Sequence, residues 1–254
     1  MKTNITCTLL LISLWLTNSI AAAATTLVAV ASNFTKPMTE IAAEFEKATG
    51  HTAKLSFGPS GKFVSQIENG APFEVFLSAD EINPIKLEQS GATVPGSRFV
   101  YALGKLVLWS ATSGYVDGQG GILNSGNFKH LALADPKLAP YGAAAVEVLK
   151  NMGLSEKLQS LMVQGENIAQ AYQFISTGNA ELGFIALSQV YENGKISSGS
   201  AWIVPSDHYS PIKQSAVLLN VGAENPASKA LLDFLKTAPA LAIIKKYGYD
   251  LANN

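Results

Sequence analysis

The stretch TLVAVASNFTKPMTEIAAEFEKATGHTAKLSFGPSG, residues 26–61, decides the fold class. Residues 26–31 are apolar or β-branched, which is typical of a buried strand. Residues 35–49 predict an amphipathic helix that ends at Gly50, and residues 53–57 predict a second strand. The helix would bury one face made of apolar side chains at helical spacing: Met38, Ile41, Ala42, Phe45 and Ala48. The stretch therefore predicts a strand–helix–strand unit with parallel strands.

The same alternation continues along the chain on both sides of a different central part. Further strands are expected at residues 73–77, 131–134, 182–185 and 201–204. Further helices are expected at residues 61–69, 84–90, 141–152, 168–176, 226–237 and 240–247. Strands that alternate with helices at this spacing predict an α/β protein.

Residues 99–110 and residues 214–221 are expected to connect separate parts of the fold. Residues 99–110 form a long apolar stretch interrupted at Gly104, which is either one strand that crosses between lobes or two strands. Residues 113–127 are rich in Gly, Ser and Asn and are typical of a loop. Residues 214–221 predict a strand that returns toward the first part of the chain.

We therefore predict two lobes that are joined by two crossing segments and enclose a ligand cleft. The first lobe would contain residues 25–105 together with 210–254, and the second would contain residues 106–209. Lobes connected in this way can close around a ligand by hinge motion.

Residues 1–24 have the pattern of a cleaved secretory signal peptide. Lys2 precedes an apolar run that is too short to span a bilayer, and small residues follow it. Cys7, which is the single cysteine, would leave with this segment, so the mature chain would hold no disulfide. The sequence thus predicts an exported, periplasmic protein.

The charge of the chain argues against two classes of partner. Removing Lys2 changes the formal net charge from −1 to −2, so no strong field of one sign remains. Nucleic-acid binding requires a basic face, and binding to a membrane surface requires a basic cluster. We therefore expect neither nucleic acid nor a membrane surface as a partner.

Hydroxyl groups stand where predicted strands end and helices begin. Ser32 and Asn33 follow the first strand, Ser60 follows the second, and Tyr141 begins a helix of the second lobe. Ligands of open α/β sheets bind at the carboxyl ends of the strands, and helix N-termini favour anions. Ser and Asn are also ordinary helix caps, so these positions become a binding site only if they converge in a cleft.

Catalytic patterns are weak. The histidines His51, His130 and His208 have no metal-binding spacing, and residues 58–62 (GPSGK) fail the phosphate-loop motif at two positions. Asp80 and Glu81 are expected to cap the following helix. The sequence thus predicts a binding protein without enzymatic activity and without a cofactor.

Several segments together resemble the periplasmic molybdate-binding proteins of ABC importers, over nearly all of the mature chain. The segments that carry this resemblance are VASNF at 30–34, FGPSG at 57–61, GAPFEVFLSAD at 70–80, YALGKLVLW at 101–109, ADP at 134–136, APYG at 139–142 and KYGY at 246–249.

The resemblance implies the two-lobed periplasmic binding protein fold with two crossing segments. It also implies an oxyanion held by hydroxyls and backbone amides without a counter-charge and without direct metal ligation. The matching positions are Ser32, Asn33, Ser60, Tyr141 and Ile168, the last through its backbone N–H. The implied partners are molybdate or tungstate and an inner-membrane ABC permease, and we expect a monomer.

The chain departs from some members of that family at Ala186. Those members carry a Tyr at this position, and its hydroxyl reaches the anion. Our hypothesis is that Tyr141 supplies the missing hydroxyl. Three alternatives stay open: a sulfate or phosphate binder, a hydrolase with Ser60 as nucleophile, and a ligand-free sensor. The sequence does not separate molybdate from tungstate.

Overall fold

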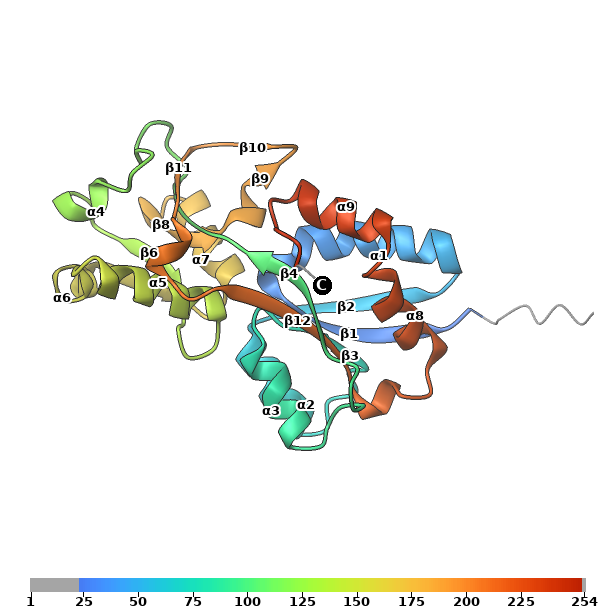
Figure 1. Cartoon of the computed structure of the whole chain (residues 1–254). Coiled ribbons are helices and arrows are strands. Elements are labelled where there is room, and N and C mark those ends of the chain that lie inside the picture. Colours follow the sequence, from blue (N-terminus) through green and yellow to red (C-terminus); the bar gives the residue numbers. More distant parts are fainter. Residues whose placement is uncertain (1–22, 253–254) are drawn as a thin grey trace, which may run out of the picture.

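The computed structural model describes residues 23–252 (Figure 1). The signal peptide predicted at residues 1–24 therefore lies, up to residue 22, outside the described residues. Within the described part of the chain, no helix combines the length and the apolar character needed to cross a membrane.

Two five-stranded sheets form the frame of the molecule, one in each of two lobes (Figure 1). The strands of the first sheet are, in spatial order, β2 (Thr52–Gly58), β1 (Thr25–Ala31), β3 (Val75–Leu77), β12 (Ile212–Leu218) and β4 (Phe99–Gly104). β1 pairs in parallel with β2 and β3, whereas β12 runs antiparallel to β3 and β4.

The second sheet is built in the same way as the first: three neighbouring strands are parallel, and the next strand runs antiparallel to both of its neighbours. Its order is β11 (Ser200–Ile203), β5 (Leu106–Ser110), β8 (Leu182–Ala186), β6 (Leu131–Ala134) and β7 (Met162–Gly165). β6 pairs in parallel with β7 and β8, and β5 runs antiparallel to β8 and β11. A small separate hairpin is formed by β9 (Tyr191–Glu192) and β10 (Lys195–Ile196).

Helices cover both faces of each sheet. In the first lobe these are α1 (Thr35–Thr49), α8 (Pro226–Phe234) and α9 (Ala238–Lys246) on one face, and α2 (Ser60–Glu68) and α3 (Ile82–Gln89) on the other (Figure 1). In the second lobe, α5 (Pro140–Asn151) and α7 (Ile168–Ser176) cover opposite faces. Two short helices, α4 (Ile122–Ser125) and α6 (Ser155–Leu158), complete it.

Burial on both faces explains why the strands are apolar without interruption. In β1, Val28 and Val30 pack against α1, α8 and α9, whereas Ala29 between them packs against α2 and α3. Successive strand residues point to opposite faces, so a strand covered on both sides has no solvent-facing positions. All three residues are fully buried.

The chain passes between the lobes at Lys105. Residues 99–110 are two strands, because β4 ends at Gly104 in one sheet and β5 begins at Leu106 in the other. The return lies between β11 and β12. The predicted two-lobed α/β architecture is thus confirmed, while β7, α4 and the β9–β10 hairpin were not predicted.

Candidate functional site

The N-termini of helical segments from both lobes meet between the two sheets. A short 3-10 turn, η1 (Ser32–Phe34), follows β1 and leads into α1, and α2 follows β2. In the second lobe α5 follows β6 and α7 follows β7. The first N–H groups of a helix have no partner within the helix, and the helix dipole is positive at this end. The meeting point of these segments therefore favours an anion.

A small cavity lies at this meeting point. Its volume is about 10 Å³, which is roughly the space that the centre of one water-sized sphere needs. Its lining comes from both lobes: Ala31, Ser32, Asn33, Gly58, Pro59, Ser60, Ala79, Ala139, Pro140, Tyr141, Asn167 and Ile168. The structure thus brings Ser32, Asn33, Ser60, Tyr141 and Ile168 together around one cavity that suits a small, compact ligand.

Two hydroxyls of the cavity lining already accept a hydrogen bond from a neighbouring nitrogen. Ser60 Oγ accepts a hydrogen bond of 3.0 Å from the Ala79 N–H. Tyr141 Oη accepts one of 3.2 Å from Gln214 Nε2. Because each oxygen already accepts from a neighbouring nitrogen, its own proton is available to a ligand. Both residues can therefore act as donors toward a ligand in the cavity.

Backbone N–H groups add further donors. Within residues 23–252, the N–H groups of Ser60, Tyr141 and Ile168 have no hydrogen-bond acceptor. Asn167 explains the case of Ile168, because its Oδ1 caps α7 by accepting from Ala169 and Gln170, the two residues that follow Ile168. The N–H of Ile168 is left for a ligand, as first-turn N–H groups are at anion-binding helix ends.

Ser32 and Asn33 differ in what their side chains can offer. Ser32 Oγ makes no hydrogen bond to any described residue and is available to a ligand. Asn33 Nδ2 donates instead to Gln214 Oε1 at 2.7 Å and to the Tyr249 hydroxyl at 2.9 Å, so its two protons are already used. Asn33 can therefore donate to a ligand only through its backbone N–H.

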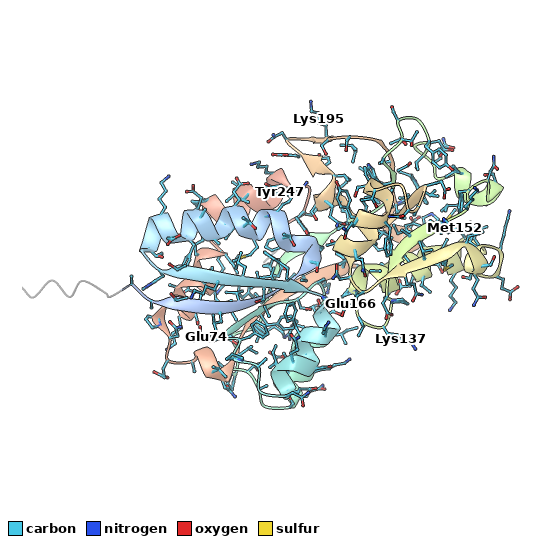
Figure 2. All side chains as sticks on the ribbon, turned by 180° about the vertical axis from the view of Figure 1, so that it is seen from behind. Glu74, Lys137, Met152, Glu166, Lys195 and Tyr247 are labelled. Carbon is cyan, nitrogen blue, oxygen red and sulfur yellow. The ribbon has the colours of Figure 1, made fainter. Side chains whose placement is uncertain are left out.

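The cavity lining contains no charged side chain among the described residues. Lys62 and Glu166 form an exposed ion pair that lines a neighbouring hollow, and this hollow shares Gly58, Pro59 and Asn167 with the cavity. Figure 2 labels Glu166 beside α2, at the seam between the lobes. An anion in the cavity would be held by neutral donors alone.

Burial keeps the phenol of Tyr141 neutral. The side chain is 1% exposed, and this burial, with other tyrosines nearby, raises the pKa of Tyr141 well above its usual value. Burial disfavours the charged form of any group. Tyr141 therefore remains a hydrogen-bond donor over the whole physiological pH range.

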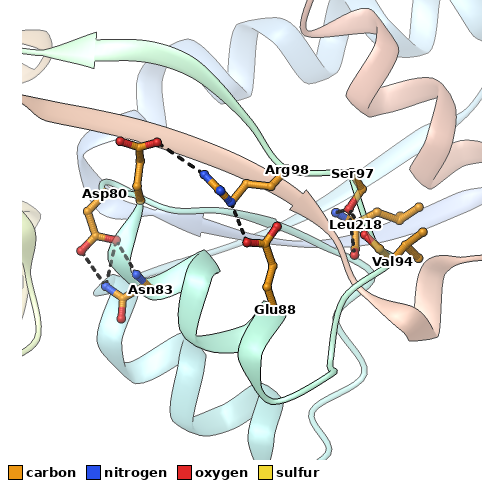
Figure 3. A network of polar contacts seen from close by, with 8 residues as sticks. Asp80, Asn83, Glu88, Val94, Ser97, Arg98 and Leu218 are labelled. Carbon is orange, nitrogen blue, oxygen red and sulfur yellow. Dashed lines mark hydrogen bonds and ion pairs between the residues drawn. The ribbon is translucent and has the colours of Figure 1, made fainter.

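The loop after β3 holds Ala79 where it can orient Ser60. Asp80 Oδ1 accepts from the Asn83 N–H at 3.0 Å, which caps α3 (Figure 3). It also accepts from Ser78 Oγ at 2.9 Å, which fixes the loop. Arg98 bonds Glu88 of α3 at 2.9 Å (Figure 3) and Glu81, which directly precedes α3, at 3.4 Å. Asp80 thus caps the helix as predicted, although Glu81 pairs with Arg98.

Several residues of the site were not predicted. Ala79 and Asn167 line the cavity, and Gln214 and Tyr249 lie behind it. Ala186 is buried at the end of β8, where its N–H donates to Gln189, and it does not line the cavity. The one available signal was Gln214, a large polar residue next to the apolar part of β12, where a buried amide needs partners.

A larger hollow of about 610 Å³ lies at the hinge, bordered by Lys105, Tyr209, Lys245 and Asp250 among others. Two of its charged groups pair with each other, since Lys105 Nζ lies 2.7 Å from Asp250 Oδ1. The smaller cavity is the candidate binding site because unpaired donors converge on it.

The chain is similar to known proteins over nearly its whole described length. The chain is 62% identical over 231 residues to the molybdate-binding protein ModA of Azotobacter vinelandii, which covers 91% of this chain and 92% of that protein. It is 57% identical over 229 residues to ModA of Rhodobacter capsulatus, covering 90% of this chain and 89% of that protein. The solved structure of an Azotobacter vinelandii periplasmic molybdate-binding protein superposes with a TM-score of 0.87 at 43% identity, over 90% of this chain and all of that one. Residues 26–250 match the family model of the bacterial extracellular solute-binding proteins, and the chain belongs to this family.

Proposed function

We propose that this chain is the periplasmic substrate-binding component of a molybdate or tungstate ABC importer. The observation that carries the proposal is a small cavity between two lobes whose polar groups are proton donors and whose lining has no charged side chain among the described residues. The chain would capture the oxyanion without chemical change and present it to an inner-membrane permease.

The anion would be held by a ring of neutral donors. Ser32, Ser60 and Tyr141 supply hydroxyls, and Asn33 and Ile168 supply backbone N–H groups. A hydrogen bond to a charged acceptor is about twice as strong as a neutral one. The cost of removing a dianion from water is large, so the donor set must be nearly complete before binding becomes favourable.

Selectivity would arise from protonation and from size. Hydrogen phosphate carries a proton, and a site made only of donors leaves that proton unpaired, which costs free energy. Sulfate is fully deprotonated but smaller than molybdate, so a cavity of fixed size would hold it with longer and weaker hydrogen bonds. Molybdate and tungstate are nearly equal in size, and the same donors would accept both.

The relatives support this proposal from an independent direction. Two proteins that share 62% and 57% identity with the chain are named for molybdate binding, and the solved relative is described as periplasmic. A periplasmic location would require export, which is the role proposed for residues 1–24. No lining residue is itself a metal ligand in this proposal, because molybdenum would be enclosed by its own oxygens.

Isothermal titration of the mature protein with molybdate, tungstate, sulfate and phosphate tests the function. We expect tight binding of molybdate and tungstate, much weaker binding of sulfate and no binding of phosphate. Tight sulfate or phosphate binding would retain the fold and overturn the assignment to molybdate. Absence of heat with all of these anions would exclude an oxyanion-binding role.

A further inference from the structure

A chain of hydrogen bonds runs from a backbone carbonyl to the candidate anion site. The Asn33 carbonyl oxygen accepts from Ser188 Oγ at 2.7 Å and from the Tyr249 hydroxyl at 3.0 Å. A carbonyl oxygen can only accept. The Tyr249 proton is therefore directed toward this carbonyl and Ser188, and the oxygen of Tyr249 is left to accept from elsewhere.

The bond from Tyr249 to the Asn33 carbonyl determines which group donates and which accepts in each bond that follows. Asn33 Nδ2 donates to the Tyr249 oxygen at 2.9 Å, so the amino group of Asn33 faces the chain. Its second proton is donated to Gln214 Oε1 at 2.7 Å. Tyr101 donates to the same Oε1 at 3.0 Å. The Tyr101 hydroxyl also lies 3.2 Å from the Ser78 carbonyl and has one proton to share between the two acceptors. The bond from Asn33 Nδ2, which can only donate, therefore sets the orientation of the Gln214 amide.

The amino group of the Gln214 side chain faces Tyr141. Gln214 Nε2 lies 3.2 Å from the Tyr141 hydroxyl oxygen and donates to it. The Tyr141 oxygen then accepts from Gln214, so its own proton is left to donate, either to the neighbouring Tyr249 hydroxyl or to an anion in the cavity. Gln214 is fully buried, and the pairing of β12 with β4 shifts register between Gln214 and Ser215. The residue left without a partner is Tyr101 of β4, which contacts the same Gln214 amide.

We propose that Gln214 is a specificity-determining residue, which makes the anion site reject protonated oxyanions by forcing the Tyr141 hydroxyl to donate. Gln214 does not touch the anion in this scheme and acts through Tyr141. The inference rests on the proposed function, because it concerns how the same site separates molybdate and sulfate from hydrogen phosphate.

Replacing Gln214 by Glu tests the direction of the chain. An ionised Glu has two acceptor oxygens, so the one facing Tyr141 would take the tyrosine proton. The Tyr141 oxygen would then face the cavity as an acceptor and could pair with the proton of hydrogen phosphate. We expect Gln214→Glu to lower molybdate affinity about 10- to 100-fold, which is the effect of one hydrogen bond to a charged group. Its affinity for hydrogen phosphate would fall less or rise.

The measured quantity is the ratio of molybdate to hydrogen phosphate affinity, with sulfate as a second unprotonated anion. In Gln214→Glu this ratio should fall further as the pH rises through the pKa of the new carboxyl, whereas the wild-type protein should lack this step. The double variant Gln214→Glu/Tyr141→Phe should lose the change toward phosphate, because the hydroxyl that mediates it is absent.

Gln189→Glu is the matched control for added negative charge. Gln189 Oε1 accepts from the Ala186 N–H and Nε2 donates to the Ile168 carbonyl, so the residue is near the site but does not face Tyr141. We expect it to weaken all anions by a similar factor. If Gln214→Glu also weakens all anions equally, its effect is charge alone and the inference is wrong.

The two proposals can fail separately. The wild-type titration alone decides the function: preference for sulfate overturns the molybdate assignment, and the sulfate to hydrogen phosphate ratio then tests Gln214. If the wild-type protein binds none of these anions, both proposals are wrong. If Gln214→Glu shows no cooperative melting transition, Tyr249→Phe is the second variant. It removes the acceptor that orients Asn33, and it should lower the same ratio several-fold; an unchanged ratio would contradict the inference.

Discussion

The Gly61 N–H donates a hydrogen bond of 3.0 Å to the Leu138 carbonyl oxygen across the cleft. Gly61 lies in the first turn of α2 in one lobe, and Leu138 lies in the segment before α5 in the other. The contact is close: a Cβ at Gly61 would lie 3.3 Å from both Cα and O of Leu138. The two lobes are therefore fitted to each other at the edge of the candidate site.

This contact predicts opposite effects of Gly61→Ala on binding and on stability. The added methyl group would crowd Leu138 when the lobes are closed, at a cost of about 1 kcal/mol. Molybdate affinity should therefore fall about three- to tenfold, measured by titration calorimetry. The melting temperature without ligand should not fall, because Ala favours α2 over Gly by about 1 kcal/mol.

Gly118→Ala is the matched control for this variant. A Cβ at Gly118 would meet no atom within 4 Å, so affinity should stay at the wild-type value. Equal affinities for Gly61→Ala and Gly118→Ala would contradict a role of the Gly61 contact in closure.

The ion pair between Lys62 and Glu166 predicts changes in association rate. The side chains are 49% and 46% exposed, so the pair stabilises the closed form by only about 0–1 kcal/mol. Charges at a cleft mouth mainly alter diffusional encounter. Lys62→Gln should slow molybdate association and Glu166→Gln should speed it, as measured by stopped-flow fluorescence. Both differences should disappear at high ionic strength. Rates that do not respond to salt would indicate a structural effect instead.

Removing the Tyr141 hydroxyl should weaken binding without unfolding the protein. Tyr141→Phe eliminates one hydrogen bond to a charged ligand and leaves Gln214 Nε2 without its acceptor. We expect a loss of about 10- to 100-fold in molybdate affinity by titration calorimetry. Tyr172→Phe is the control, because Tyr172 stacks on Trp109 away from the cavity. Unchanged affinity of Tyr141→Phe would refute the hypothesis that this hydroxyl replaces the one missing at Ala186.

The strand–helix alternation could be predicted because burial on both faces leaves a clear pattern. The continuous apolar run of β1 and the helical spacing of α1 are local properties, and both were found within a residue or two. β7, by contrast, is short and carries Gln164 at an exposed edge position, so it lacks the apolar run that marks a strand. Its identity depends on pairing with β6, which is not a local property.

The site was predictable where its residues follow strands, and unpredictable where they act through a network. Ser32, Ser60 and Tyr141 stand at strand–helix junctions that the sequence reveals. The role of the Asn33 side chain could not be predicted from its position after a strand. Its partners Gln214 and Tyr249 are 181 and 216 residues away in the sequence, and only the folded structure brings them together.

The contact between α1 and α9 predicts a loss of stability at alkaline pH. Tyr247 donates to Glu40 at 2.9 Å, and burial together with this carboxylate raises the pKa of Tyr247 from 10.0 to about 12. Because the folded-state pKa is raised, the stabilisation is fully present below pH 10 and is lost as the pH rises through about 12. Tyr247→Phe should lower the free energy of unfolding by about 1 kcal/mol near neutral pH. It should also flatten the decline between pH 10 and 12, measured by urea denaturation. If the free energy of unfolding of Tyr247→Phe declines as steeply as that of the wild type, groups other than Tyr247 cause the decline.

Gly104 should be required for the position of Tyr141. A Cβ at Gly104 would lie 2.1 Å from the Tyr141 hydroxyl oxygen and 2.9 Å from Gln214 Nε2, distances that no real contact allows. Gly104 ends β4 at the crossing between lobes, so its backbone cannot move away without shifting the hinge. Gly104→Ala must therefore displace Tyr141, and we expect molybdate affinity to fall at least as far as in Tyr141→Phe.

The losses of molybdate affinity caused by Gly104→Ala and by Tyr141→Phe should not add. This distinguishes displacement of the Tyr141 hydroxyl from a general disturbance of the structure. In the double variant Gly104→Ala/Tyr141→Phe the smaller Phe side chain relieves the closest contact, so its affinity should equal that of Tyr141→Phe alone. Coupling of this kind is expected for residues in direct contact. If the double variant binds far more weakly than either single variant, Gly104 acts through the hinge and not through Tyr141. Titration calorimetry of the three variants, with Gly118→Ala as the control, separates the two explanations.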